Sequence, residues 1–214
     1  MTVISPAILT DNPEVYKTEI ERLDGLVEAV HIDYTDGEFA PSFTLAAQDI
    51  WWPKEWKASI HAMVARPSEH IDALIKLAPD LVIFHAETSE DITPLMQKLK
   101  SNGIRAGVAL LKSTVPAQVK PLIDLADHVM IFSGDLGKHG GKASMMQLEK
   151  VRLIRGIRPS IEIGWDGGVT IDNAFSLSQG GIDVLNIGGE FSNSKDPHAT
   201  YNAIVKELTK RSVI

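Results

Sequence analysis

The sequence predicts a single (β/α)8 TIM barrel. Strand and helix patterns alternate along the whole 214-residue chain, as eight strand–helix units of about 25 residues each, which is the arrangement of such a barrel. Polar residues follow several strands at their carboxyl ends, where barrels of this kind carry their active sites. Because no linker or low-complexity segment divides the chain, we expect residues 1–214 to form one domain. An open, doubly wound sheet shows the same alternation and is the alternative fold.

Eight short apolar runs bounded by turn residues predict the strands. The second strand carries His31 and Asp33 and ends at the turn signal Asp36-Gly37, after which a long connection, residues 38–57, leads to the third. The other predicted strands are residues 3–9, 58–63, 81–85, 105–111, 128–132, 161–165 and 184–187.

Apolar residues spaced three or four positions apart predict the helices between these strands. Asn12 and Pro13 provide a cap and a first residue for the first helix, and Thr170 caps a later one. Pro121 interrupts the helix expected over residues 116–126. The apolar stripes consist of Tyr16, Ile20 and Leu23; Ile71, Leu74, Ile75 and Ala78; Ile92, Leu95, Met96 and Leu99; Leu148, Val151 and Ile154; Ala174 and Leu177; and Tyr201, Ile204, Val205 and Leu208.

The composition narrows the classes of partner and ligand. A net charge of −7 argues against a broad nucleic-acid surface. No apolar run approaches the ~20 residues that cross a bilayer, and the first residues lack the pattern of a secretory signal. We therefore expect a cytoplasmic protein with neither a nucleic-acid nor a membrane partner. The chain contains no cysteine, so any metal must be bound by His, Asp or Glu.

Four side chains at the ends of three strands predict a metal site. His31 and Asp33 point to the same side of the second strand because side chains alternate. His61 lies in the end region of the third strand, and Asp166 begins an Asp-Gly-Gly turn after the seventh. Each of them taken singly fits an ordinary hydrogen-bonded or turn residue. Together they would face one mouth of the barrel. Two imidazoles and two carboxylates suit one Zn²⁺ per chain, with Mn²⁺, Fe²⁺ or Co²⁺ as alternatives.

Two carboxylates that face each other across a metal also suit proton transfer. One of them can remove a proton next to a carbonyl while the other delivers a proton to the opposite face of the same carbon. A metal bound to the substrate oxygens stabilises the enediolate that forms between the two steps. Chemistry of this kind inverts a stereocentre.

Two glycine pairs predict a phosphate site. Gly140-Gly141 follows the sixth strand and Gly188-Gly189 follows the eighth, and the late loops of such barrels recurrently bind phosphate. Lys138, His139 and Lys142 flank the first pair and could add positive charge. An ordinary pair of flexible loops would show the same residues.

The chain resembles the ribulose-phosphate 3-epimerase family in order over nearly its whole length. The most specific segments are residues 31–41, HIDYTDGEFAP, and residues 166–169, DGGV. The other matching segments are residues 4–9 (ISPAIL), 61–63 (HAM), 107–110 (GVAL), 172–174 (DNA) and 181–185 (GIDVL).

The resemblance implies a TIM barrel of the ribulose-phosphate-binding type, with a divalent metal held by His31, Asp33, His61 and Asp166. It implies that Asp33 and Asp166 are the acid/base pair of an isomerase that inverts C3 of a phosphorylated ketose, with ribulose 5-phosphate and xylulose 5-phosphate as the expected pair. It also implies a phosphate site in the late loops. The residues predicted for that site are Gly140, Gly141, Lys142, Gly167, Gly168, Gly188 and Gly189.

Several positions depart from the family pattern. Ala7 stands where the family has a serine that reaches substrate, Thr35 where it has a methionine, and Leu111-Lys112 where it has Asn-Pro. The loop over residues 134–142 is longer and more basic than in the family. The departures suggest a shifted sugar phosphate or lost activity.

Three alternatives follow for the function. One is a ketohexose-phosphate 3-epimerase of the allulose 6-phosphate type, and another is a non-catalytic sugar-phosphate-binding protein on the same scaffold. A decarboxylase or aldolase on a related barrel is disfavoured, because those families carry an Asp-x-Lys-x-x-Asp motif and residues 31–36 contain no lysine.

Two further groups of residues lie outside the predicted site. His85 and Glu87 resemble a His-x-Glu stretch of the family, which we interpret as hydrogen-bonded support for the metal ligands rather than as ligands. Trp51, Trp52 and Trp56 fit local packing or a subunit contact better than substrate stacking. We expect the chain to form a homo-oligomer.

Overall fold

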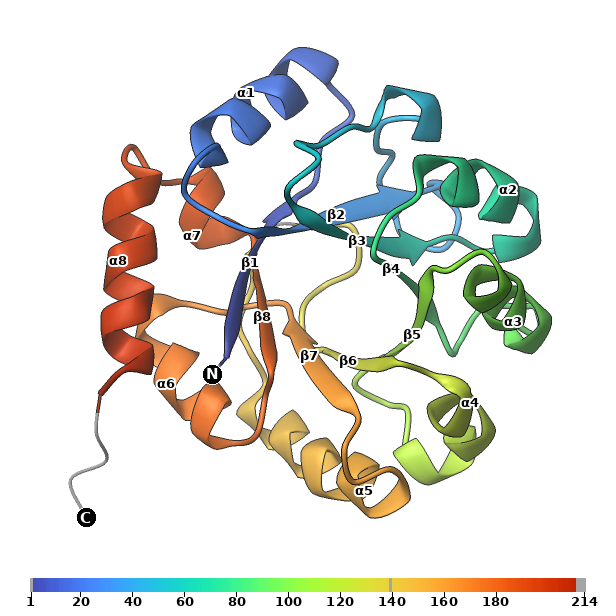
Figure 1. Cartoon of the computed structure of the whole chain (residues 1–214). Coiled ribbons are helices and arrows are strands. Elements are labelled where there is room, and N and C mark those ends of the chain that lie inside the picture. Colours follow the sequence, from blue (N-terminus) through green and yellow to red (C-terminus); the bar gives the residue numbers. More distant parts are fainter. Residues whose placement is uncertain (1, 139, 211–214) are drawn as a thin grey trace.

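The computed structural model describes residues 2–138 and 140–210. Its eight strands form a closed parallel barrel in the order of the sequence, and β8 returns to pair with β1 (Figure 1). The predicted TIM barrel is therefore confirmed, and the open sheet is wrong. The strands are β1 (Val3–Ile8), β2 (Ala29–Thr35), β3 (Lys57–Met63), β4 (Leu81–His85), β5 (Arg105–Leu110), β6 (His128–Phe132), β7 (Glu162–Asp166) and β8 (Val184–Ile187).

The helices surround the barrel as an outer ring (Figure 1). The Asn12 side chain accepts hydrogen bonds from the backbone N–H groups of Glu14 and Val15, as its predicted capping role requires. Thr170 likewise forms a capping box with Asn173. The α-helices are α1 (Pro13–Leu23), α2 (Pro67–Leu77), α3 (Thr93–Ser101), α4 (Lys120–Leu125), α5 (Glu149–Ile157), α6 (Ile171–Gln179), α7 (Gly189–Ser192) and α8 (Pro197–Leu208). Three short 3₁₀ segments are η1 (Ala47–Asp49), η2 (Pro116–Val119) and η3 (Met145–Leu148).

The structure differs from the sequence prediction mainly at element ends. The interrupted helix over residues 116–126 is divided into η2 and α4, because Pro121 occupies the first turn of α4, where its missing N–H costs no helical bond. Strand β7 extends to Asp166, so this carboxylate ends a strand instead of beginning a turn. The short helix α7 directly after β8 was not predicted.

The main hydrophobic core lies between the barrel and the helices. Outward-facing strand residues such as Ile60, Val108 and Ile131 pack there with helix residues such as Leu74 and Leu177. A much smaller apolar cluster of β4, β5 and β6 residues lies apart from this core. Several fully or almost fully buried side chains are instead polar: His31, Ser5, His61, His85, His128 and Asn186.

The tryptophans after β2 belong to the packing of this region. Trp56 is buried and Trp52 packs against the core. The Trp51 ring is more exposed, and its backbone carbonyl accepts a 2.7 Å hydrogen bond from the Tyr16 hydroxyl. These contacts agree with local packing.

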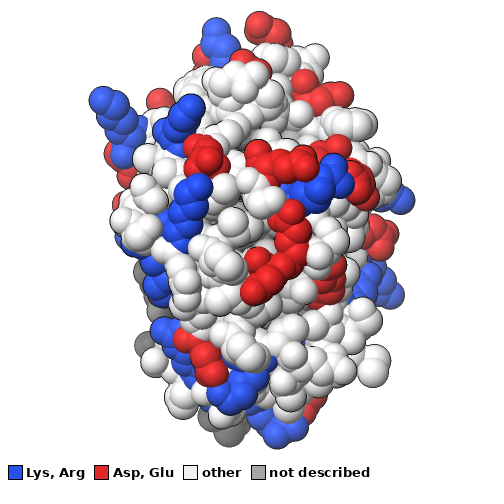
Figure 2. Space-filling model, turned by 90° about the vertical axis from the view of Figure 1, so that its right-hand side faces the viewer, with Lys and Arg blue, Asp and Glu red and all other residues white. Residues whose placement is uncertain are grey.

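The outer surface carries charges of both signs. Figure 2 shows acidic and basic side chains interspersed on the side of the molecule that includes α2 and α3. An ion pair between these two helices joins Lys98 and Asp72 at 2.6 Å, and exposed pairs of this kind contribute little to stability. Within the described part of the chain, no helix combines the length and apolar character needed to cross a membrane.

Candidate metal centre and substrate pocket

The structure brings the four predicted metal-binding residues together at one mouth of the barrel. His31 and Asp33 lie on β2, His61 on β3 and Asp166 at the end of β7. Asp33 and His61 are register partners on adjacent strands, so their side chains start side by side. One ligand atom from each of the four residues lies within 4.8 Å of the others. Such a cluster can hold a divalent metal.

Each imidazole approaches both carboxylates. His61 Nδ1 lies 2.9 Å from Asp33 Oδ1 and 3.3 Å from Asp166 Oδ2. His31 Nε2 lies 3.6 Å and 3.7 Å from the same two oxygen atoms. Both histidine side chains are fully buried, whereas the carboxylates keep 13% and 12% exposure and so remain open to the pocket above them.

The hydrogen bonds of His31 direct one of its ring nitrogens toward the centre of this cluster. The hydroxyl of Ser59 donates to the Val30 carbonyl at 3.4 Å, and it therefore accepts from His31 Nδ1–H at 2.9 Å. The remaining nitrogen, Nε2, is buried and has no hydrogen-bond partner among the described residues. A buried polar atom without a partner is costly, so the lone pair of His31 Nε2 fits a metal at this position.

The charges of the cluster shift two pKa values in opposite directions. Burial alone would lower the pKa of His61, but hydrogen bonds with Asp166 and Asp33 and their negative charges raise it to about 9. Burial opposes ionisation of Asp33, but its polar contacts with the His31 and His61 rings hold its pKa well below its usual range. Without a metal, His61 therefore carries a proton that balances the carboxylates.

His85 stands next to this cluster and not within it. This last residue of β4 is fully buried, and its Nε2 lies 2.8 Å from His61 Nε2. Burial lowers the pKa of His85 to about 4, which keeps the ring neutral near pH 7. The structure therefore places His85 as a hydrogen-bonding neighbour of His61, which agrees with its interpretation as support.

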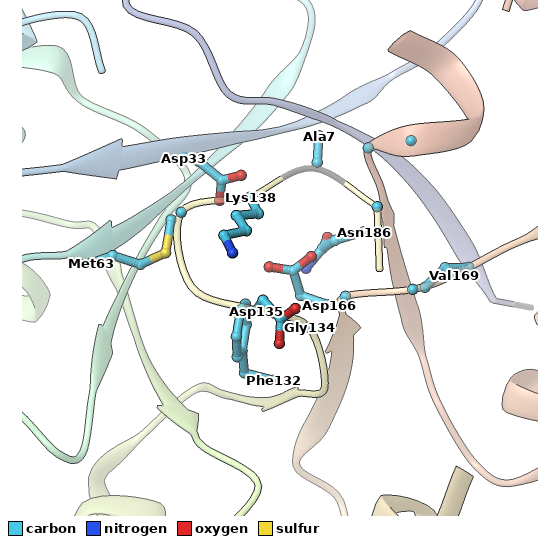
Figure 3. Close-up of a pocket in the computed structure, with 16 residues that line it drawn as sticks. Ala7, Asp33, Met63, Phe132, Gly134, Asp135, Lys138, Asp166, Val169 and Asn186 are labelled. Atoms are coloured by element: carbon cyan, nitrogen blue, oxygen red, sulfur yellow. The ribbon is translucent and has the colours of Figure 1, made fainter. Parts of the chain in front are cut away.

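A pocket opens above the two carboxylates. The loops after β6, β7 and β8 enclose it together with Ala7 of β1 and Met63 of β3. Figure 3 shows Lys138 and Asp135, both from the loop after β6, extending into this pocket together with Asp33 and Asp166. The pocket is therefore polar and directly adjoins the four-residue cluster.

Most of the residues predicted to bind phosphate line this pocket. They are Gly140, Gly167, Gly168, Gly188 and Gly189. Gly141 and Lys142 are not among its lining residues.

Two of the glycines are also required by backbone packing, because the loops after β6 and β7 touch. A Cβ atom would lie 2.0 Å from Gly134 N at Gly167 and 2.1 Å from Ala143 N at Gly168, and both residues have positive φ.

Three polar residues of the pocket or cluster were missed from the sequence: Ser59, Asp135 and Asn186. Lys138 was noted as a charge that flanks the first glycine pair, and it lines the pocket. Ser59 and His61 lie two positions apart on β3 and so face the same side, which is a signal that could have been used. The loop residues Asp135 and Lys138 follow no such period, because a loop has no fixed side-chain alternation.

Comparisons with known proteins agree with this geometry. A family model described as the ribulose-phosphate 3 epimerase family matches residues 3–191. The ribulose-phosphate 3-epimerase of Helicobacter pylori is 28% identical over 200 residues, which cover 90% of this chain and 92% of that protein. The cytoplasmic isoform of ribulose-phosphate 3-epimerase from Oryza sativa subsp. japonica is 31% identical over 216 residues, which cover 96% and 93%.

Solved structures share the fold at lower identity. The crystal structure of 3-hexulose-6-phosphate synthase from Salmonella typhimurium aligns with a TM-score of 0.72 and 14% identity, covering 97% of this chain and 98% of that one. This likeness shows the fold alone. The family match and the two relatives go further: the chain belongs to the ribulose-phosphate 3-epimerase family.

Proposed function

We propose that this protein is a metal-dependent epimerase that inverts the C3 stereocentre of a phosphorylated ketose, with ribulose 5-phosphate and xylulose 5-phosphate as the first expected pair. Membership of its family makes the chain an isomerase. The observation that carries the proposal is the convergence of four donor atoms, from His31, Asp33, His61 and Asp166, within 4.8 Å of one another.

The residues present fit a divalent metal. Two imidazole nitrogens and two carboxylate oxygens form a donor set that suits Zn²⁺, with Mn²⁺, Fe²⁺ and Co²⁺ as alternatives. The buried, unpartnered Nε2 of His31 supports this assignment, because a metal would supply the missing interaction. When bound, such a metal supplies Lewis-acid stabilisation of negative charge on substrate oxygen atoms.

The two carboxylates would perform the proton transfers. Asp33 and Asp166 come from β2 and β7, and both keep partial exposure to the pocket. In one direction an ionised Asp33 would accept the proton from C3, and a protonated Asp166 would donate its proton to the opposite face of the same carbon. In the reverse direction the two residues exchange roles. The fully buried His31 and His61 would hold these carboxylates in place while excluding water from beneath them.

The phosphate would bind where the late loops enclose the pocket. Gly167 and Gly168 follow β7, and Gly188 and Gly189 lie between β8 and the short helix α7. Loops after the seventh and eighth strands and a short extra helix form a recurrent phosphate site in TIM barrels. Gly140 lines the same pocket from the loop after β6. Gly141 and Lys142, the other two residues predicted for this site, follow Gly140 directly in the same loop.

Three residues favour a second candidate substrate. Ala7 lines the pocket where the family carries a serine, and Asp135 and Lys138 bring opposite charges into the pocket from the rebuilt loop. These changes alter the walls around the sugar while leaving the four-residue cluster intact. A ketohexose phosphate of the allulose 6-phosphate type is therefore the second candidate, and binding without turnover is the third.

A single experiment separates these candidates. Purified protein is analysed for bound metal, loaded with Zn²⁺ or Mn²⁺, and incubated in D₂O with ketopentose and ketohexose phosphates. We expect deuterium at C3 of one sugar phosphate, together with its C3 epimer, detected by NMR. Binding by calorimetry without exchange at any carbon would reject the enzyme and favour the binding protein.

Three broader expectations complete the proposal. We propose one domain over residues 1–214, a cytoplasmic location and a homo-oligomeric assembly. Light scattering coupled to size exclusion measures the assembly directly, and a monomeric mass would contradict it.

A further inference from the structure

Glu87 lies outside the four-residue cluster but is connected to it through His85. Glu87 Oε2 is 3.3 Å from His85 Nδ1, and His85 Nε2 is 2.8 Å from His61 Nε2. Where two imidazole nitrogens face each other at this distance, one must donate a proton and the other must accept it. The partner of His85 Nδ1, which is Glu87, decides whether Nε2 of His85 or Nε2 of His61 is the donor.

The contacts of Glu87 leave it only one role. Its Oε1 accepts a 2.9 Å hydrogen bond from the backbone N–H of Leu111 and another from the hydroxyl of Thr114. A backbone N–H can only donate, and an ionised carboxylate can only accept. Hydrogen bonds to Glu87 hold its pKa below the usual value although burial opposes ionisation. Glu87 is therefore held as an acceptor toward His85.

Because Glu87 accepts, the nitrogens that carry protons on His85 and on His61 are determined. A neutral His85 donates from Nδ1 to Glu87, so its Nε2 carries a lone pair. That lone pair accepts a hydrogen bond from His61 Nε2–H. Because Nε2 of His61 keeps its proton, Nδ1 is the nitrogen that releases its proton when a metal binds, and this atom lies 2.9 Å from Asp33 Oδ1 and 3.3 Å from Asp166 Oδ2.

We propose that Glu87 is a positioning residue that acts through His85 to fix the tautomer of His61, so that Nδ1 of His61 is presented to a divalent metal. This inference rests on the metal site of the proposed function. The tautomer of the other histidine, His31, is fixed by the neighbouring hydroxyl of Ser59 on β3. The tautomer of His61 depends instead on a connection that ends in the loop after β5.

The loop after β5 is held in place by a residue of the outer helix α5. The Lys150 ammonium of α5 donates hydrogen bonds to the backbone carbonyls of Leu111 and Lys112. Lys150 is buried, with 7% exposure. The Leu111 peptide is thus held both through its N–H by Glu87 and through its carbonyl by Lys150, which supports a fixed direction of the hydrogen bonds.

The variant Glu87→Gln tests the inference, because it replaces one acceptor by an NH₂ donor at almost unchanged shape. The backbone N–H of Leu111 cannot reverse, so it retains the remaining oxygen and the NH₂ group faces His85 Nδ1. His85 must then accept at Nδ1 and donate from Nε2, so His61 must accept at Nε2 and keep its proton on Nδ1, where the metal would bind. We expect zinc affinity, measured by chelator competition, to fall about 10- to 100-fold.

The matched control is Thr114→Val, which removes a hydroxyl donor from the same carboxylate but keeps Leu111 N–H and His85 as its partners. Its zinc affinity should stay within about twofold of wild type. Long-range ¹H–¹⁵N NMR of labelled histidines gives the direct readout in both metal-free and zinc-loaded protein. We expect His85 to be protonated at Nδ1 in the wild type and at Nε2 in Glu87→Gln.

A wild-type His85 protonated at Nε2 overturns the inference, as does a Glu87→Gln protein with wild-type zinc affinity and an unchanged tautomer. Failure of the wild type to bind any divalent metal would contradict the proposed function instead, and the metal-free spectrum would still decide the tautomer of His85. If Glu87→Gln does not fold by circular dichroism, His85→Phe replaces it. Phenylalanine retains the ring and removes the acceptor for His61 Nε2–H, so the same loss of zinc affinity is expected.

Discussion

Removing the hydroxyl of Ser59 should disturb the candidate metal centre without touching any of its four donor residues. In the structure this hydroxyl accepts the Nδ1–H of His31 at 2.9 Å, and the His31 side chain is fully buried. In Ser59→Ala the Nδ1–H group loses this acceptor. The ring can then rotate or change tautomer, which removes Nε2 from its position beside Asp33 and Asp166.

The magnitude follows from the burial of His31. A buried donor left without an acceptor costs about 1–3 kcal/mol of unfolding free energy. For a domain of this size each kcal/mol lowers the melting temperature by roughly 2–4 °C, so we expect a decrease of about 2–12 °C in the metal-free protein. Loss of the partner that orients a metal-binding histidine lowers metal affinity by about 10- to 100-fold.

Urea unfolding of the metal-free protein and chelator competition for Zn²⁺ measure the two effects separately. Ser5→Ala is the matched control, since Ser5 is a buried serine on β1 for which no hydrogen bond to the four donor residues is found within the described part of the chain. Wild-type stability together with wild-type zinc affinity in Ser59→Ala would refute the role of this hydroxyl.

Four further predictions address the reaction, the loops and the pH dependence. Asp166→Asn should lower kcat by about 10²- to 10⁴-fold. Asp33 should still exchange the C3 proton of one epimer in this variant, which deuterium exchange followed by NMR would detect. A kcat equal to that of the wild type would contradict the acid/base pair. Gly168→Ala should destabilise the protein by at least about 1 kcal/mol in a urea titration, because its Cβ would lie 2.1 Å from Ala143 N at a positive φ; an unchanged midpoint would show that the two loops separate easily. Burial opposes ionisation of Glu162, but hydrogen bonds from His128 and Arg105 and their charges lower its pKa from 4.5 to about 2, so its contribution to stability is complete above pH 4.5 and is lost as the pH falls toward 2. Glu162→Gln should therefore be less stable than wild type by about 1 kcal/mol at pH 7, with a smaller difference at pH 3, and a difference independent of pH would contradict this. Removal of metal by a chelator should abolish turnover and lower the melting temperature, and Zn²⁺ or Mn²⁺ should restore both; full activity after verified removal would reject the metal.

Regular strand geometry explains why much of the site could be predicted from the sequence. His31, Asp33 and His61 are set by alternation on β2 and β3, and the same rule was available for Ser59. The barrel itself follows from apolar periodicity, and Pro121 correctly marked the break between η2 and α4. The features that could be predicted are therefore those that follow the regular period of a strand or a helix.

Features set by contacts between distant loops could not be predicted in this way. Gly167 and Gly168 were interpreted as phosphate-binding residues, yet their backbone also approaches Gly134 and Ala143 in the loop after β6. The entry of Lys138 into the pocket depends on how that loop folds over the barrel mouth. The contact between His85 and His61 requires both the barrel curvature and the ring orientations, neither of which is visible in a linear sequence.

The pairing of β8 with β1 has a consequence for how the protein is made. His31, Asp33 and His61 are synthesised early, but Asp166 comes from β7, near the end of the chain, and the barrel closes only when β8 meets β1. Until then both outermost strands expose unpaired backbone groups that can join other chains. A nascent or truncated chain that lacks β7 and β8 would thus hold three of the four donor residues on an unfinished sheet, exposed to aggregation and without the carboxylate that completes the four-residue cluster.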